Sequence, residues 1–139
     1  MIVVEPTHLK AIADAAEAAY PNECCGLLVG TGRRPVRVTR LLPAANLAGS
    51  SGNRFELDPR VRLDAERSLR GTAERVIGHY HSHPDGSALP SPTDLAEAWE
   101  PELIWLIVGV VDGQAIQTQA HRLDRALGRS RPVALATRK

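Results

Sequence analysis

The sequence lacks long hydrophobic runs, which argues against a membrane-spanning helix. No apolar stretch approaches the about 18 residues that a helix needs to cross a bilayer. The first ten residues, MIVVEPTHLK, also lack the charged segment followed by an apolar segment that is typical of a signal peptide. We therefore expect a cytoplasmic protein that has no membrane as a partner.

The sequence has few cysteines and no large excess of positive or negative charge. The two cysteines, Cys24 and Cys25, are neighbours, and a disulfide between adjacent residues would be badly strained. A disulfide-bonded scaffold is therefore excluded, in agreement with a reducing compartment. The formal net charge is +1, whereas nucleic-acid binding needs a concentrated basic face. We expect no nucleic-acid partner.

Helix and strand patterns alternate along a chain that has the size of one domain, 139 residues. Apolar residues at helical spacing or in short runs, with Pro and Gly between them, delimit the elements. We expect helices over 6–20, 59–69 and 91–100, and strands over 23–30, 35–42, 54–58, 74–83, 103–111 and 114–123. This order predicts an α/β or α+β fold with a mixed β-sheet.

The domain is expected to span residues 1–123. A loop is expected over 44–53. Residues 124–139 are rich in arginine and form a basic C-terminal tail, which we expect to fray.

Three of the five histidines lie within five residues. Side chains alternate along a strand, so His79, His81 and His83 share one face, together with Ile77. Solvated imidazoles at a polar strand end are the simplest interpretation, but a His-x-His pair aims two rings into one space, and His is the commonest metal ligand. The outer two histidines lie about 13 Å apart along the strand, so two neighbours fit one ion far more easily than three. The strand alone leaves both neighbouring pairs open.

The residues after the strand favour the pair formed by His81 and His83. The SPTD segment, residues 91–94, is typical of a helix start with Ser91 as N-cap. A short loop bracketed by prolines returns the chain from the end of the strand. Asp94 could simply complement the helix dipole, but its position predicts a third ligand. Two imidazoles, one carboxylate and an open position are typical of a catalytic zinc site, whereas structural sites usually include Cys.

These residues resemble the signature of the JAMM (MPN+) zinc metallopeptidases, the JAB-domain family, in its compact bacterial stand-alone form. The pattern is H-x-H, then seven residues, then S-x-x-D, and its members here are His81, His83, Ser91 and Asp94. The family also has a glutamate just before an apolar strand, and NECCGLLVG is similar, with Glu23 in the position of that glutamate. The resemblance covers nearly the whole chain.

The resemblance implies a cytidine-deaminase-like mixed β-sheet flanked by helices, with one Zn²⁺ per chain. It implies hydrolysis of a peptide or isopeptide bond after the C-terminal glycine of a ubiquitin-like or sulfur-carrier protein that has a Gly-Gly end. Release of a C-terminal cysteine is one form of this reaction. The resemblance leaves open whether the protein forms a homodimer.

Roles for single residues also follow from the resemblance. His81, His83 and Asp94 become the metal ligands, and Glu23 becomes the general base. Ser91 becomes a donor to the developing oxyanion in addition to its role as a cap. The family commonly has an aromatic or other bulky apolar residue where this chain has His79. We expect His79 to line the pocket or to contact a group outside the ligand set, and not to bind the metal.

Two other functions are compatible with the same fold. One is a non-catalytic binding or scaffold domain, although such domains usually lack part of the ligand set. The other is a cell-wall or phage-assembly peptidase, whose catalytic domain is often fused to another module.

Overall fold

The computed structural model describes residues 1–48 and 54–138. Within these ranges no helix is long and apolar enough to cross a membrane. In chain order the elements are β1 (Ile2–Val4), α1 (Pro6–Ala19), β2 (Cys25–Thr31), β3 (Val36–Ala44), α2 (Pro59–Leu69), β4 (Arg75–His83), α3 (Pro92–Ala96), β5 (Ile104–Val111), β6 (Gln114–Asp124), β7 (Arg129–Val133) and β8 (Leu135–Thr137).

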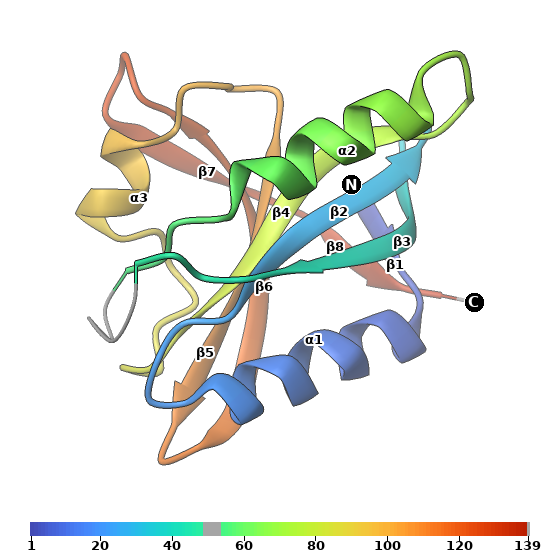
Figure 1. Cartoon of the computed structure of the whole chain (residues 1–139). Helices are drawn as coiled ribbons and strands as arrows, with labels where there is room; N and C mark the ends of the chain where they lie inside the picture. Colours follow the sequence, from blue (N-terminus) through green and yellow to red (C-terminus); the bar gives the residue numbers. More distant parts are fainter. Residues whose placement is uncertain (49–53, 139) are drawn as a thin grey trace.

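One mixed eight-stranded sheet forms the centre of the molecule, in the order β7-β6-β5-β4-β2-β3-β1-β8. β4 and β5 pair in parallel, and β2 pairs antiparallel with both β3 and β4. In Figure 1, α1 lies against one face of the sheet, whereas α2 and α3 lie on the other side. The α/β class and the mixed sheet flanked by helices are confirmed.

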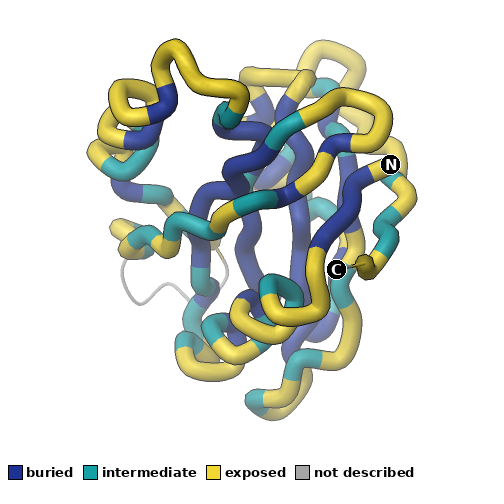
Figure 2. Tube along the Cα trace, turned by 90° about the vertical axis from the view of Figure 1, so that its right-hand side faces the viewer, coloured by how far each residue is buried: buried dark blue, intermediate teal, exposed yellow. Residues whose placement is uncertain are grey.

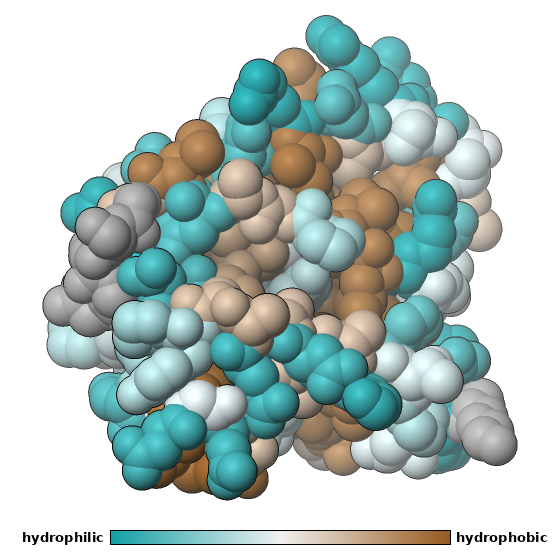
Figure 3. Space-filling model, turned by 60° about the horizontal axis from the view of Figure 1, so that its bottom comes forward, coloured by the Kyte–Doolittle hydropathy of each residue, from teal (hydrophilic) through white to brown (hydrophobic). Residues whose placement is uncertain are grey.

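Two apolar layers hold the helices on the sheet. Ile12 and Ala16 of α1 pack on the larger cluster, which includes Tyr80 and Leu106. On the opposite face, α2 packs its buried residues against β2 and β4. Buried residues therefore follow the central strands, while the outer sides of the helices are exposed (Figure 2). Figure 3 shows that hydrophobic side chains also gather toward the middle of one outer face, with hydrophilic ones around them.

The C-terminal segment is part of the sheet and is not a frayed tail. β7 pairs with β6 at one edge, and β8 pairs with β1 at the other edge. Only Ala134 separates these two strands, and its carbonyl accepts a hydrogen bond from the amide of Ile2 at 2.8 Å. One segment thus joins both edges and curls the sheet toward a barrel. The sequence did not predict these strands because β7 is mostly polar, β8 has only three residues, and the edge pairing is supplied by backbone groups of distant residues.

Most of the expected elements are confirmed within a few residues. Asp58 caps α2, and its carboxylate accepts a hydrogen bond from the amide of Arg60. The Asp112-Gly113 turn has positive φ at both residues, as a tight hairpin requires. Three expectations are wrong. The 54–58 segment contributes only an isolated bridge between Asn46 and Leu57. The helix expected over 91–100 ends at Ala96, after five residues. The third is the frayed C-terminal tail, because β7 and β8 lie in that segment.

One residue of β4, Ile77, does not lie on the face that simple alternation along the strand predicts. The pairing register with β2 shifts between Leu28 and Val29, which leaves Ile77 as an extra residue. Ile77 therefore packs in the α1-side cluster with Tyr80, and not on the face of the histidines. Residues 49–53 of the expected loop lie outside the described residues.

We predict that Gly78→Ala destabilises the protein by about 3 kcal/mol or more. A Cβ at Gly78 would lie 2.0 Å from the carbonyl oxygen of Ile104, in the central pairing of β4 with β5. Gly71→Ala is the control, because nothing lies within 4 Å of its Cβ and only its positive φ is strained, at about 1 kcal/mol. Urea unfolding measures both changes, and equal losses would contradict this account of the sheet.

Candidate metal centre

The end of β4 carries two imidazoles that converge on one point. Nε2 of His81 and Nε2 of His83 lie 3.0 Å apart. Oδ2 of Asp94 lies 3.2 Å from the first and 3.1 Å from the second. All three residues are at least nine-tenths buried. Three donor atoms from two elements thus form a nearly equilateral triangle.

The start of α3 fixes the carboxylate of Asp94 in this triangle. Ser91 is the N-cap, and its Oγ accepts a hydrogen bond from the amide of Asp94 at 3.0 Å. In return, Oδ2 of Asp94 accepts from the amide of Ser91 at 2.8 Å. This reciprocal arrangement is a capping box, which satisfies two amides that the helix itself leaves free. The expected cap at Ser91 is confirmed, and it orients the acid toward the histidines.

The pairing of β2 with β4 brings Glu23 to the same place from far upstream. Cys25 faces His81 in this antiparallel pair, so the chain two residues earlier reaches the level of His83. The amide of Cys24 donates to Oγ of Ser82 at 2.9 Å, across 58 residues of sequence. Carboxylate and imidazole donor atoms of Glu23, His81 and His83 all lie within 4.8 Å of one another.

Hydrogen bonds outside the triangle set the orientation of His83. Its Nδ1 donates to the carbonyl of Ser87 at 3.1 Å, so in the neutral ring the Nε2 has no proton and can bind a cation. Burial opposes the charged form of this ring, but the hydrogen bond and charge of Asp94 outweigh burial and raise the pKa of His83. Burial would likewise raise the pKa of the Asp94 carboxyl, yet its bonds to both histidines hold that pKa well below the usual value.

The donor triangle fits a zinc ion. Ligand bonds of about 2.0 Å in a tetrahedral site place neighbouring donor atoms about 3.3 Å apart, and the observed separations are 3.0 to 3.2 Å. Lone pairs of two imidazoles and a carboxylate point at one another here, which is favourable only when a proton or a cation lies between them. The residues therefore suit a metal with three protein ligands.

Glu23 is the unusual acid of the site. Its side chain is 3% exposed, and its Oε1 has no hydrogen-bond partner among the described residues. Burial raises the pKa of Glu23 to about 8, although His83 partly opposes this shift. A buried carboxyl without a partner is costly, so its place beside the histidines calls for a chemical role.

His79 stays outside the metal-donor triangle. Its ring packs against Trp105, with the ring centroids 4.2 Å apart. Burial, together with His81 beside it, lowers the pKa of His79 to about 3. The structure thus brings together Glu23, His81, His83, Ser91 and Asp94, as the sequence predicts, and leaves His79 aside in a neighbouring cavity.

Three residues around the site were missed by the sequence analysis. Phe55 stacks on the ring of His81, with centroids 4.2 Å apart and planes 23° apart. Nδ2 of Asn46 donates to the carbonyl of Glu23 at 2.9 Å and so anchors that segment. The carbonyl of Ser87 orients His83. The only signal in the sequence for these contacts is Phe55, which is the one phenylalanine of the chain and lies in a polar segment.

Comparison with known proteins places this fold and site among the JAB domains. The family model described as prokaryotic homologs of the JAB domain matches residues 5–124. A solution structure of a protein from Desulfitobacterium hafniense superposes with a TM-score of 0.84 at 28% identity and covers 100% of this chain and 94% of that chain. The chain therefore belongs to the prokaryotic JAB-domain family.

Three curated relatives carry names that describe their roles. The desampylase of Haloferax volcanii is 33% identical over 94 residues, which are 68% of this chain and 67% of the relative. The CysO-cysteine peptidase of Mycobacterium tuberculosis is 28% identical over 133 residues, 96% of this chain and 90% of the relative. The tail tip assembly protein K of Escherichia phage N15 is 35% identical over 105 residues, 76% of this chain but 40% of that protein.

We predict that His81→Ala and Asp94→Ala each weaken zinc binding by at least about a hundredfold, since each removes one corner of the donor triangle. His8→Ala, on α1, is the control and keeps the metal. Elemental analysis after dialysis gives the zinc content, and the fall in melting temperature on adding a chelator gives a second readout. One zinc per chain in both site variants would contradict the assignment.

Proposed function

We propose that this protein is a zinc-dependent peptidase that hydrolyses a peptide or isopeptide bond after the C-terminal glycine of a ubiquitin-like or sulfur-carrier protein. The observation that carries the proposal is the convergence of His81, His83 and Asp94 at 3.0 to 3.2 Å, with the carboxyl of Glu23 beside them. The substrate class is supported by the names of two relatives, desampylase and CysO-cysteine peptidase.

Three residues would hold one zinc ion per chain. The imidazoles of His81 and His83 and the carboxylate of Asp94 supply neutral nitrogen and charged oxygen ligands, which are the types that catalytic zinc sites use. Bound zinc supplies a Lewis acid that polarises a carbonyl and lowers the pKa of water to about 7. The hydrogen bonds from His83 to Ser87 and from the Ser91 amide to Asp94 keep these ligands in position.

Glu23 is the group that moves the proton. As a carboxylate it takes a proton from the attacking water, and as a carboxylic acid it returns that proton to the nitrogen of the leaving amine. Burial raises the pKa of Glu23 to about 8, and a positive charge beside it would lower that value toward neutrality. An acid whose pKa lies near the working pH suits both steps.

Ser91 can stabilise the negative charge that develops on the scissile carbonyl oxygen. Its Oγ accepts a hydrogen bond from the amide of Asp94, so the hydroxyl proton remains available to donate. Ser91 lines the same surface cavity as Glu23 and His83. A donor fixed beside the reacting carbonyl contributes on the order of 10² to 10³ in rate.

We predict that Glu23→Gln keeps zinc but loses a factor of about 10² to 10⁴ in kcat, because the amide cannot accept the proton. Ser91→Ala should also keep zinc and lose about 10² in kcat, together with about 1 kcal/mol of stability from the lost cap. Ser68→Ala, on the far side of α2, serves as the control. Turnover by Glu23→Gln at the wild-type rate would show that another group is the base.

The substrate is tested directly with a sulfur-carrier protein extended beyond its Gly-Gly end. We expect the zinc-loaded protein to cut after the second glycine, and mass spectrometry of the products identifies the bond. The same carrier with Ala-Ala in place of Gly-Gly is the matched control, because it removes the proposed Gly-Gly end and keeps the rest of the carrier. No cut, or a cut elsewhere, would contradict the proposed substrate.

Other functions of the fold are less well supported. A non-catalytic scaffold would not need a full set of ligands, an unpartnered buried acid and a hydroxyl donor in one place. The phage tail tip protein is matched over less than half of its length. We infer a cytoplasmic location, which agrees with two free cysteines in the described chain, and the proposed activity requires only one copy, so a homodimer is not needed for it.

A further inference from the structure

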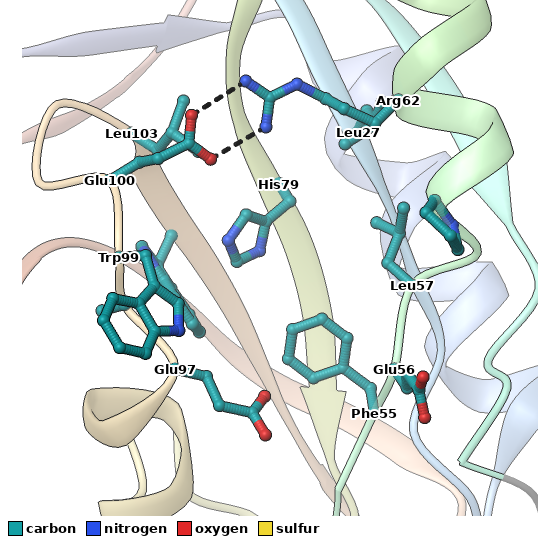
Figure 4. A pocket seen from close by; sticks show the side chains of 13 residues that line it. Leu27, Phe55, Glu56, Leu57, Arg62, His79, Glu97, Trp99, Glu100 and Leu103 are labelled. Atoms are coloured by element: carbon teal, nitrogen blue, oxygen red, sulfur yellow. Dashed lines mark hydrogen bonds and ion pairs between the residues drawn. The ribbon is translucent and has the colours of Figure 1, made fainter.

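A cavity of about 280 Å³ lies beside the candidate metal centre, on the face of the sheet opposite to α1. It is bounded by β2, the segment before α2, α2 itself, β4, the segment after α3, and β5. Its lining residues include Phe55, Arg62, His79, Glu97, Trp99 and Trp105. Figure 4 shows His79 at its floor, with Trp99 and Phe55 on either side.

The ring of Phe55 lies between this cavity and the candidate metal centre. Phe55 lines the cavity and stacks on His81, which belongs to the donor triangle. His79 is two residues before His81 on β4, a separation of about 7 Å along the strand. At the far end, the guanidinium of Arg62 makes two hydrogen bonds of 3.0 Å to the carboxylate of Glu100, which closes the cavity there (Figure 4).

The cavity combines an apolar interior with acidic groups. Both tryptophans of the chain and its only phenylalanine line it. Among its lining residues, Glu56 and Glu97 form no ion pair with any residue that the structure describes, whereas Arg62 is engaged by Glu100. Glu97 extends toward the space between Trp99 and Phe55 (Figure 4). Aromatic faces together with free carboxylates favour a cationic group on an apolar stem.

The position of the cavity identifies the part of the substrate that can reach it. Glu23 and His83 line a separate cavity on the other side of His81. Because Glu23 would return a proton to the leaving amine, the amine lies on the side of Glu23, and the acyl part leads toward Phe55. An extended chain covers about 3.3 to 3.6 Å per residue, so the residue two positions before the cleaved carbonyl is level with His79.

We propose that this cavity is a specificity subsite for a basic side chain, Arg or Lys, on the residue that precedes the Gly-Gly pair of the substrate, with Glu97 as the main selecting residue. The proposal rests on the proposed function, which supplies the direction of the chain. The Gly-Gly pair then passes Phe55, where side chains would be crowded. The stem of the basic residue lies against Trp99 and Phe55, and its head group lies near Glu97.

His79 contributes an aromatic ring to the floor of this subsite. The ring points into the cavity (Figure 4) and packs against Trp105, whereas its Nδ1 is buried and has no hydrogen-bond partner among the described residues. His79 therefore shapes the floor, and Glu97 and Glu56 supply the negative charges that a basic head group could meet.

The two tryptophans make occupancy directly measurable. Peptides that end in X-Gly-Gly, with X as Arg, Gln or Glu, are titrated into the zinc-loaded protein while its tryptophan fluorescence is followed. The Arg peptide should change the fluorescence and bind threefold to tenfold more tightly than the Gln peptide, and more tightly still than the Glu peptide. The preference should weaken as the salt concentration rises, because exposed carboxylates are screened.

Variants assign the preference to single residues. Glu97→Gln should abolish the difference between the Arg and Gln peptides, and Glu97→Lys should reverse the order of the Arg and Glu peptides. His79→Phe keeps an aromatic ring on the floor and should keep the preference. Asp64→Asn, which removes the same charge from α2 outside the cavity, should leave it unchanged. Fluorogenic amides of the same peptides should show the preference in KM and not in kcat.

Each outcome separates this inference from the proposed function. Cleavage of the amides with no dependence on X would overturn the subsite and leave the peptidase intact. Binding that depends on X and on Glu97, without cleavage, would support the subsite and overturn the proposed reaction. Neither cleavage nor a change in tryptophan fluorescence would overturn both.

Discussion

The structure of the site depends on three buried donor atoms that point at one another. Nε2 of His81, Nε2 of His83 and Oδ2 of Asp94 lie 3.0 to 3.2 Å apart, and such lone pairs repel unless a proton or a cation lies between them. The fold accepts this cost because hydrogen bonds fix two of the donors, Asp94 by the capping box of α3 and His83 by the carbonyl of Ser87, while Phe55 stacks on the ring of His81. A divalent cation would turn the cost into a stabilising interaction.

The rest of the fold can be understood as the means of assembling this site from distant segments. The antiparallel pair of β2 and β4 brings Glu23 beside His83, and Asn46 anchors the same segment through the carbonyl of Glu23. The parallel pair of β4 and β5 then supplies Trp105, which packs beside His79. The site therefore has a buried acid, Glu23, on one side and the aromatic ring of Phe55 on the other, and in the proposed function this asymmetry would give a bound chain its direction.

Local patterns in the sequence predicted the parts of the structure that are locally determined. The apolar spacing of α1, the buried run of β5 and the Ser91 cap each act over a few residues, and the structure contains all three. The His-x-His pair and its return to Asp94 are also local. The position of Glu23 beside them came from family resemblance, because a pairing across 58 residues leaves no local signal.

What the sequence could not predict depends on partners that are far apart in the chain. β7 is mostly polar and β8 has only three residues, and their pairing with β6 and β1 uses backbone groups. A one-residue register shift reversed the side of Ile77 without any mark in the sequence. The aromatic cavity is lined by residues from six segments. The sequence therefore showed that His79 departs from the family pattern, but it did not show which residues surround His79. A zinc K-edge X-ray absorption spectrum of the protein would test the metal site most directly. We predict a shell of nitrogen and oxygen atoms at about 2.0 Å that includes two imidazoles, whereas sulfur at about 2.3 Å or an absence of bound zinc would contradict the three-ligand site.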